Sequence, residues 1–157
     1  MELPKTISLT HLNRKAVQGV VMDQVHVLRL DLLAAPAPGN KIFKLRQYLI
    51  LARQRGLARV VSFGGGWSNH LHALAAVGAE LGLETVGLVR GEEDEVDTPT
   101  LADARTLGMD IRRITRGDYR RRNDVDFLAE VEAQFQPCLV IPEGGGSAPG
   151  IRGCLAL

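Results

Sequence analysis

The stretch RVVSFGGGWSNHLHALAAVGAELGLETVGLV, residues 59–89, decides the fold of this chain. It opens with a short apolar strand at residues 59–63, then passes through a glycine run into a segment with helical spacing of apolar residues at 69–82. A second apolar strand follows at residues 84–89. Apolar strands that alternate with helices over short connections are typical of a parallel sheet covered by helices.

The alternation continues on both sides of this stretch. Thr98 and Pro99 have the pattern of a helix start, a capping hydroxyl followed by proline at the first helical position. Further helices are predicted at residues 40–55, 100–108 and 124–135, and further strands at residues 25–31, 110–114 and 138–143. The chain is therefore predicted to be an α/β protein with an open, mostly parallel twisted sheet and helices on both faces.

Composition excludes several classes of function. The chain has 157 residues, 24% of them charged, and a formal net charge of +1, so it does not resemble an electrostatic binder of nucleic acid or of membranes. The one basic segment, RRITRGDYRRR at residues 112–122, is interpreted as a solvated or partner-facing patch, with nucleic-acid binding as the less favoured alternative.

The sequence also bears on location and on metals. No apolar run is long enough for a membrane helix, and the first residues lack the apolar core of a signal peptide. Cys138 and Cys154 have no metal-ligand spacing; Cys138 is expected to be a small buried strand residue and Cys154 a helix residue, both structural, in a cytoplasmic protein. The acidic loop at residues 91–97 has contiguous carboxylates, which favours a solvated connection over a metal site, and no metal is expected.

The glycine loop at residues 64–66 is the first candidate site, because ligands of such sheets lie beyond the carboxyl ends of the strands. Ser68 or Asn69 can cap the following helix, whose free N–H groups suit a carboxylate or a phosphate. The alternative is a tight turn with an ordinary cap. A dinucleotide fingerprint is excluded because Asn69 stands where its third glycine is required. Trp67 is expected to be a pocket wall rather than a core residue, and His70 and His72 are not spaced as a ligand pair on one helix face.

The second candidate is GNKIFK, residues 39–44, where two lysines fall at the start of a predicted helix. Cations there oppose the helix macrodipole. Lys41 and Lys44 are either plain surface charges or functional groups, and the residues alone leave both possibilities open.

Taken together, these motifs resemble the fold type II pyridoxal-phosphate enzymes, and within them the 1-aminocyclopropane-1-carboxylate deaminase and D-cysteine desulfhydrase family. The resemblance runs from about Asp31 to the last residue. The motifs that carry it are Gly39-Asn40-Lys41, Lys44-Leu45, Gly64-Gly65, Ser68-Asn69-His70, Asp118-Tyr119-Arg120-Arg121, Asn123-Asp124 and Pro142-Glu143-Gly144-Gly145.

The resemblance implies a role for each matching residue. Lys41 occupies the position of the lysine that forms a Schiff base with pyridoxal 5'-phosphate. Ser68 stands where a serine contacts the substrate carboxylate and acts as nucleophile or proton carrier. Asn69 matches the asparagine that hydrogen-bonds the ring oxygen of the cofactor. The backbone around Ser68, Asn69 and His70 would hold the carboxylate of a small amino acid. Lys44 is a candidate cofactor-binding residue whose role stays open.

Members of that family are longer than this chain. The resemblance divides the sequence into residues 1–55, a segment of a large domain with the lysine helix, residues 56–145, a small α/β domain, and residues 146–157, the start of a return to the large domain. It implies a deaminase or lyase that gives a 2-oxo acid and ammonia.

The loop that cradles the phosphate is expected later in such enzymes, so Gly144–Gly146 are interpreted as an active-site wall. A chain that stops earlier is expected to retain the cofactor weakly, if at all, and to form a homo-oligomer. The alternative is a non-catalytic oligomeric α/β domain. Trp67 beside Ser68 argues against the cyclopropane substrate, and the amino acid is left undetermined.

Overall fold

A computed structural model describes residues 7–17, 20–33, 37, 39–155 and 157 of the chain. Its centre is a four-stranded parallel sheet in the order β5-β4-β3-β6. The strands are β3 (Arg59–Gly64), β4 (Glu84–Arg90), β5 (Asp110–Ile114) and β6 (Cys138–Ile141). Val61 of β3 is paired with Val86 on one side and Val140 on the other, so β3 is a central strand. The predicted fold class is confirmed.

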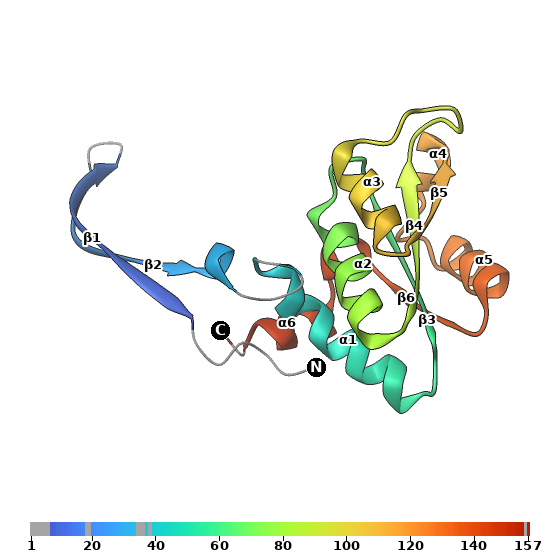
Figure 1. The fold of residues 1–157 in the computed structure, drawn as a ribbon, viewed down its shortest axis with the longest axis horizontal. Helices are drawn as coiled ribbons and strands as arrows, with labels where there is room; N and C mark the ends of the chain where they lie inside the picture. Colours follow the sequence, from blue (N-terminus) through green and yellow to red (C-terminus); the bar gives the residue numbers. More distant parts are fainter. Residues whose placement is uncertain (1–6, 18–19, 34–36, 38, 156) are drawn as a thin grey trace.

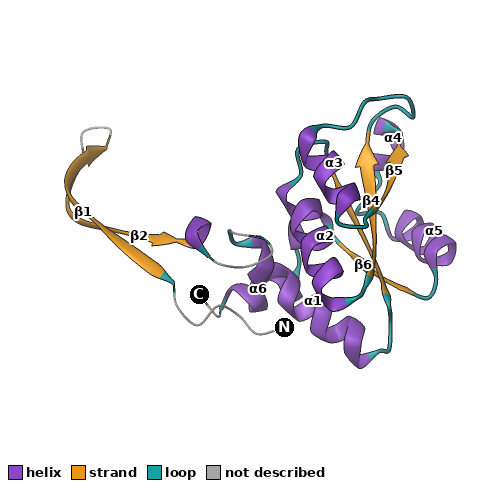
Figure 2. Ribbon diagram, in the orientation of Figure 1, coloured by secondary structure: helices purple, strands orange, loops and turns teal. Residues whose placement is uncertain are grey.

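Helices cover both faces of this sheet (Figures 1 and 2). One face carries α1 (Lys41–Gln54), α2 (Asn69–Leu81), α3 (Pro99–Thr106) and α6 (Ala148–Cys154), and the other carries α4 (Arg116–Arg120) and α5 (Val125–Phe135). Two short 3-10 turns, η1 (Leu30–Leu32) and η2 (Glu143–Gly145), complete the elements.

The side chains of β3 alternate between two hydrophobic cores. Val60 packs with the α1 and α2 side chains, whereas Val61 and Phe63 pack with α4 and α5. Phe63 faces Phe127 of α5 with ring centroids 6.3 Å apart. A strand buried on both faces has no position for a solvated side chain, which explains why β3 and β4 are mostly apolar, whereas the edge strand β5 carries three charged residues.

The N-terminal region differs from the sequence-based prediction. A strand was predicted only at residues 25–31, but β1 (Ser8–Val17) and β2 (Val20–Arg29) form an antiparallel hairpin, and residues 30–32 turn into η1. Figure 1 shows the hairpin extending away from the α/β body. Pairing with β1 extends β2 toward the N-terminus. The added residues of β2 form a strand because they pair with β1, and the local pattern of apolar and polar residues does not indicate them.

Three further details correct the prediction. The unpredicted helix α4 begins where the Thr115 hydroxyl oxygen accepts a hydrogen bond from the Asp118 backbone N–H. β6 ends at Ile141, because the next residue is a proline without an N–H and the chain turns there into η2. Cys138 and Cys154 are free thiols but only half-buried, since each lies at an end of its element.

Pro38 is part of the turn predicted before the lysine helix, and it lies outside the described residues. Among the helices the structure describes, none has the length and apolarity needed to cross a membrane.

Candidate functional site

Lys41 is the first residue of α1 and is half-buried. The helix buries Ile42, Phe43 and Leu45 against the sheet and α2, which turns its first residue toward the start of α2. Asn40 precedes it without a capping side-chain hydrogen bond. The start of α1 therefore lacks a side-chain cap and carries a primary amine instead.

The start of α2 is built by Ser68. Its hydroxyl oxygen accepts a hydrogen bond from the Leu71 backbone N–H at 3.2 Å, as a helix cap does. Gly64 makes room for this hydroxyl, because a Cβ there would lie 2.6 Å from Ser68 Oγ. The Thr98 hydroxyl donates to the Gly66 carbonyl oxygen and anchors the loop from the other side. Sequence reasoning left the cap open between Ser68 and Asn69, and the structure assigns it to Ser68.

The two helix starts meet across a cavity of about 520 Å³. Its lining residues are Asp31, Ala37, Gly39, Asn40, Lys41, Asn69, His72 and Ala73. The structure thus brings together Lys41 and Asn69, two of the predicted site residues. Ser68, His70 and Lys44 are not among the lining residues and stand behind or beside the cavity.

His70 is buried, with 3% of its surface exposed, and its ring is tied to the sheet. Its Nε2 lies 2.9 Å from Ser62 Oγ, and the Ser62 hydroxyl donates to the Ile141 carbonyl oxygen at 2.8 Å. Since that hydroxyl proton is already used, Ser62 accepts from Nε2–H, which leaves Nδ1 as the lone-pair nitrogen. Nδ1 is buried and has no hydrogen-bond partner among the described residues.

Electrostatics keep this imidazole neutral. Burial, followed by the positive field of Lys41, lowers the pKa of His70 from 6.5 to about 4, while the Glu143 carboxylate acts in the opposite direction. At neutral pH His70 is therefore a hydrogen-bonding group without a charge. It lies close enough to the lysines of α1 to respond to their charges.

Two ionisable residues that line the cavity, His72 and Asp31, were not predicted as site residues. His72 lies one turn after Asn69 on α2, and its Nε2 is 2.5 Å from Asp103 Oδ2 of α3. Asp31 lies in η1, where a hydrogen bond from Arg29 lowers the pKa of its carboxyl group. The three-residue spacing of Asn69 and His72 on one helix face could have indicated His72. Nothing local in the sequence indicated Asp31.

Lys44 has a different environment from Lys41. Gly145 of η2 packs against it, because a Cβ at Gly145 would lie 3.2 Å from Lys44 Cβ. Gly145 also has a φ of 66°, a conformation that favours glycine. Lys44 therefore supports the loop at residues 144–146, and no glycine of that loop lines the Lys41 cavity.

Trp67 does not line this cavity either. Its side chain is 69% exposed in the glycine loop. Trp67 was expected to be a pocket wall rather than a core residue. It is not a core residue, and it is not a wall of the Lys41 cavity.

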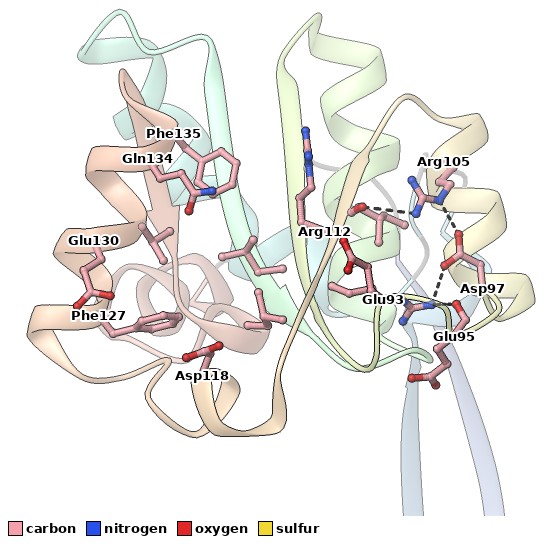
Figure 3. Close-up of a pocket in the computed structure, with 15 residues that line it drawn as sticks. Glu93, Glu95, Asp97, Arg105, Arg112, Asp118, Phe127, Glu130, Gln134 and Phe135 are labelled. Carbon is pink, nitrogen blue, oxygen red and sulfur yellow. Dashed lines mark hydrogen bonds and ion pairs between the residues drawn. The ribbon is translucent and has the colours of Figure 1, made fainter.

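A separate cavity of about 800 Å³ lies between α5 and the β4–β5 edge of the sheet (Figure 3). Two of its arginines share one carboxylate: Asp97 pairs with Arg105 at 2.5 Å and with Arg113 at 2.8 Å. The acidic loop thus finds arginine partners at its end. None of the predicted site residues lines this cavity, so it is not the candidate active site.

Known proteins with similar sequences point to one family. The chain is 34% identical over 131 residues to a putative 1-aminocyclopropane-1-carboxylate deaminase of Thermotoga maritima, covering 82% of this chain and 42% of the relative. It is 30% identical over 136 residues to a D-cysteine desulfhydrase of Yersinia pestis, covering 83% of this chain and 41% of the relative. No family model matches the chain.

Solved structures agree with this result. A crystal structure of an ACC deaminase homologue matches with a TM-score of 0.69 and 29% identity, covering 85% of this chain and 41% of that one. A hydrogen sulfide-producing enzyme of Fusobacterium nucleatum matches with a TM-score of 0.61 at 15% identity, covering 88% of this chain and 43% of that one, and supports the fold alone.

The parallel sheet with helices on both faces has the fold of the fold type II class, and the starts of two of its helices bring Lys41 and Asn69 to one cavity. Within that class, the chain is a relative of the 1-aminocyclopropane-1-carboxylate deaminases and D-cysteine desulfhydrases. It spans about two fifths of the length of the curated relatives it matches.

Proposed function

We propose that this chain is the lysine-bearing part of a pyridoxal-phosphate-dependent deaminase or lyase that converts a small amino acid into a 2-oxo acid and ammonia. The observation that carries the proposal is the meeting of Lys41 and Asn69 in one cavity, next to the Ser68 cap. Because the chain spans only part of its relatives, the activity proposed is that of the whole protein.

The residues present fit the aldehyde and ring side of the cofactor. Lys41 would hold the aldehyde side of the cofactor through its primary amine, and Asn69 would hold the ring oxygen through its amide. The cavity volume of about 520 Å³ is ordinary for a small-molecule site. When bound, pyridoxal phosphate supplies an electron sink for a carbanion of the amino acid.

The chain's own residues would orient the amino acid and handle its proton. Asn69 and His70 are the first residues of α2, where backbone N–H groups have no partner within the helix and attract a carboxylate. The Ser68 hydroxyl oxygen accepts from Leu71, so its proton stays available to a carboxylate or for transfer. Neutral His70 adds no charge that would compete with Lys41 for the carboxylate.

The choice of amino acid stays within the family's two reactions, ring opening of 1-aminocyclopropane-1-carboxylate or sulfide elimination from D-cysteine. The division into residues 1–55, 56–145 and 146–157, a homo-oligomeric assembly and a cytoplasmic location likewise remain predictions.

Reductive trapping tests the role of Lys41. The chain is incubated with saturating pyridoxal phosphate, reduced with borohydride, digested and mapped by mass spectrometry. We expect the reduced cofactor adduct to concentrate on the peptide that contains Lys41 and to disappear from it in Lys41→Ala. Lys44→Ala serves as the matched control and should keep the label on Lys41. Two results would refute the assignment. One is equal labelling of Lys41 and Lys44, and the other is labelling of other lysines with none on Lys41.

A second measurement separates the enzyme from a non-catalytic domain. The chain is run on a size-exclusion column, and its fractions are assayed for ammonia and sulfide with each of the two amino acids. Release of ammonia that is lost in Lys41→Ala supports the enzyme. A stable oligomer without turnover and without selective Lys41 labelling supports the non-catalytic alternative.

A further inference from the structure

The structure sorts the arginines of residues 112–122 into two groups. Most have carboxylate partners: the pairs are Arg112 with Asp110, Arg113 with Asp97, Arg121 with Glu130 and Arg122 with Glu143. Arg116 and Arg120 are different, because neither forms an ion pair or a side-chain hydrogen bond with any residue that the structure describes. The segment is therefore not a uniformly neutralised surface.

The unpaired arginines lie around a cavity at the carboxyl edge of the sheet. This cavity of about 390 Å³ is lined by Arg90, Arg116, Tyr119, Arg120 and Arg122, and we call its four arginines the arginine cluster. Arg90 ends β4, and its guanidinium lies 5.5 Å from the centroid of the Tyr119 ring; that of Arg122 lies 4.6 Å from it. Arg90 of β4 thus joins three arginines of residues 116–122 at one cavity.

The positive charge of the cluster is only partly balanced. Glu143 accepts hydrogen bonds from Arg122 at 2.6 Å and from the Tyr119 hydroxyl, and burial raises the pKa of that hydroxyl. Asp118 lies in α4 with Tyr119, but its carboxylate accepts a hydrogen bond from the Thr115 hydroxyl and lines the cavity of Figure 3 instead of the cavity of the arginine cluster. The remaining guanidinium groups repel one another, a cost that an anion in the cavity would remove.

The local chemistry favours a small anion over nucleic acid. Binding of single strands relies on exposed aromatic rings that stack on bases. Tyr119 is 6% exposed, its ring is occupied by guanidinium groups, and its hydroxyl is bonded to Glu143. Guanidinium groups form paired hydrogen bonds with phosphate oxygens, and several of them around one cavity suit a dianion.

We propose that the arginine cluster binds the phosphate group of a small phosphorylated molecule. The cluster shares no residue with the Lys41 cavity, so the proposal goes beyond the proposed function and stands or falls separately from it.

Titration calorimetry on the chain tests the proposal, with inorganic phosphate and glycerol 3-phosphate as probes at low, constant ionic strength. We expect saturable binding of at least one probe. Arg90→Gln and Arg120→Gln should each weaken it by about fivefold or more, because each removes a charge-assisted contact. Arg55→Gln, an exposed arginine at the end of α1 outside the cluster, removes the same charge and should leave affinity unchanged.

Circular dichroism of each variant verifies that the fold is kept. Absence of saturable binding to both probes overturns the proposal, as does equal weakening by Arg55→Gln. Binding confined to a single-stranded oligonucleotide or to vesicles of an anionic phospholipid, with none to the two small phosphates, overturns it as well.

Discussion

Two glycine-rich loops leave the carboxyl edge of the sheet from neighbouring strands, and they are held in different ways. The loop after β3, residues 65–68, is shaped mainly by its own neighbours: Gly64 at the end of β3 makes room for Ser68, and Ser68 caps α2, with one added hydrogen bond from distant Thr98. The loop after β6, residues 142–147, is held by distant groups. Tyr119 and Arg122 bind its Glu143, and Tyr48 of α1 shares a hydrogen bond with its Ser147.

The difference shows how similar glycine patterns serve two purposes. The first loop is a local motif that places the helix start of a candidate site. The second is a junction where α1, α4 and α6 meet, and its Gly145 allows close packing against Lys44 of α1. Ser62 joins the two, because it bonds both His70 of α2 and the Ile141 carbonyl oxygen just before the second loop.

The largest effect is expected from a methyl group at the junction. In Gly153→Ala of α6, the new Cβ would run into the carbonyl oxygen of Phe43, a backbone atom that can move only if α6 separates from α1. We expect a loss of about 3 kcal/mol in the free energy of unfolding, measured by urea denaturation.

The first loop supplies the matched comparisons for this experiment. Gly64→Ala meets only side-chain atoms of Ser68 and Leu71, so about 1–2 kcal/mol is expected. Gly65→Ala meets no atom within 4 Å and should be nearly neutral. Equal losses at Gly153 and Gly65 would contradict the close contact between α6 and α1 described at Gly153.

An intermediate effect is expected from pH, through the histidine that connects the loops. The pKa of His70 is about 4 in the folded chain against 6.5 for an ordinary histidine. Between these two pH values, the unfolded state binds a proton at His70 and the folded state does not. This contribution to stability is fully present above pH 6.5 and is lost as the pH falls toward 4.

We expect the free energy of unfolding to fall by about 2 kcal/mol more between pH 7 and pH 5 in the natural chain than in His70→Gln. Urea denaturation at both pH values provides the measurement. If the two chains have the same pH dependence, His70 is not the buried neutral group described.

The smallest effect distinguishes the serines that end the two loops. Ser68→Ala removes a helix cap and should cost about 1 kcal/mol, and Ser68→Asp should restore most of it because aspartate also caps helices. Ser147 makes no capping hydrogen bond. Ser147→Ala should cost a similar amount through the lost Tyr48 bond; Tyr48→Phe should lose about as much, and the double variant little more. A loss in Ser68→Ala that Ser68→Asp leaves unchanged would contradict the capping role of Ser68.

Much of the fold could be predicted because its signals are local. Apolar strands of four to seven residues, Thr98-Pro99 and the run after Ser68 all fall where the structure has them. The hairpin was incompletely predicted, since β2 owes its length to β1. Helix α4 was missed because only five residues form it, too few for a helical pattern.

For the site, the sequence by itself determined the chemical groups: an amine at Lys41, an amide at Asn69 and a hydroxyl at Ser68, while the structure decided that Ser68 rather than Asn69 caps α2. The sequence also determined their places at helix starts, because caps and apolar spacing depend on neighbouring residues. Only the tertiary structure decided that Lys41 and Asn69 share a cavity, that His70 is neutral, and which arginines lack partners. Those properties depend on burial and on charges from elements far apart in the chain, and no local pattern encodes them.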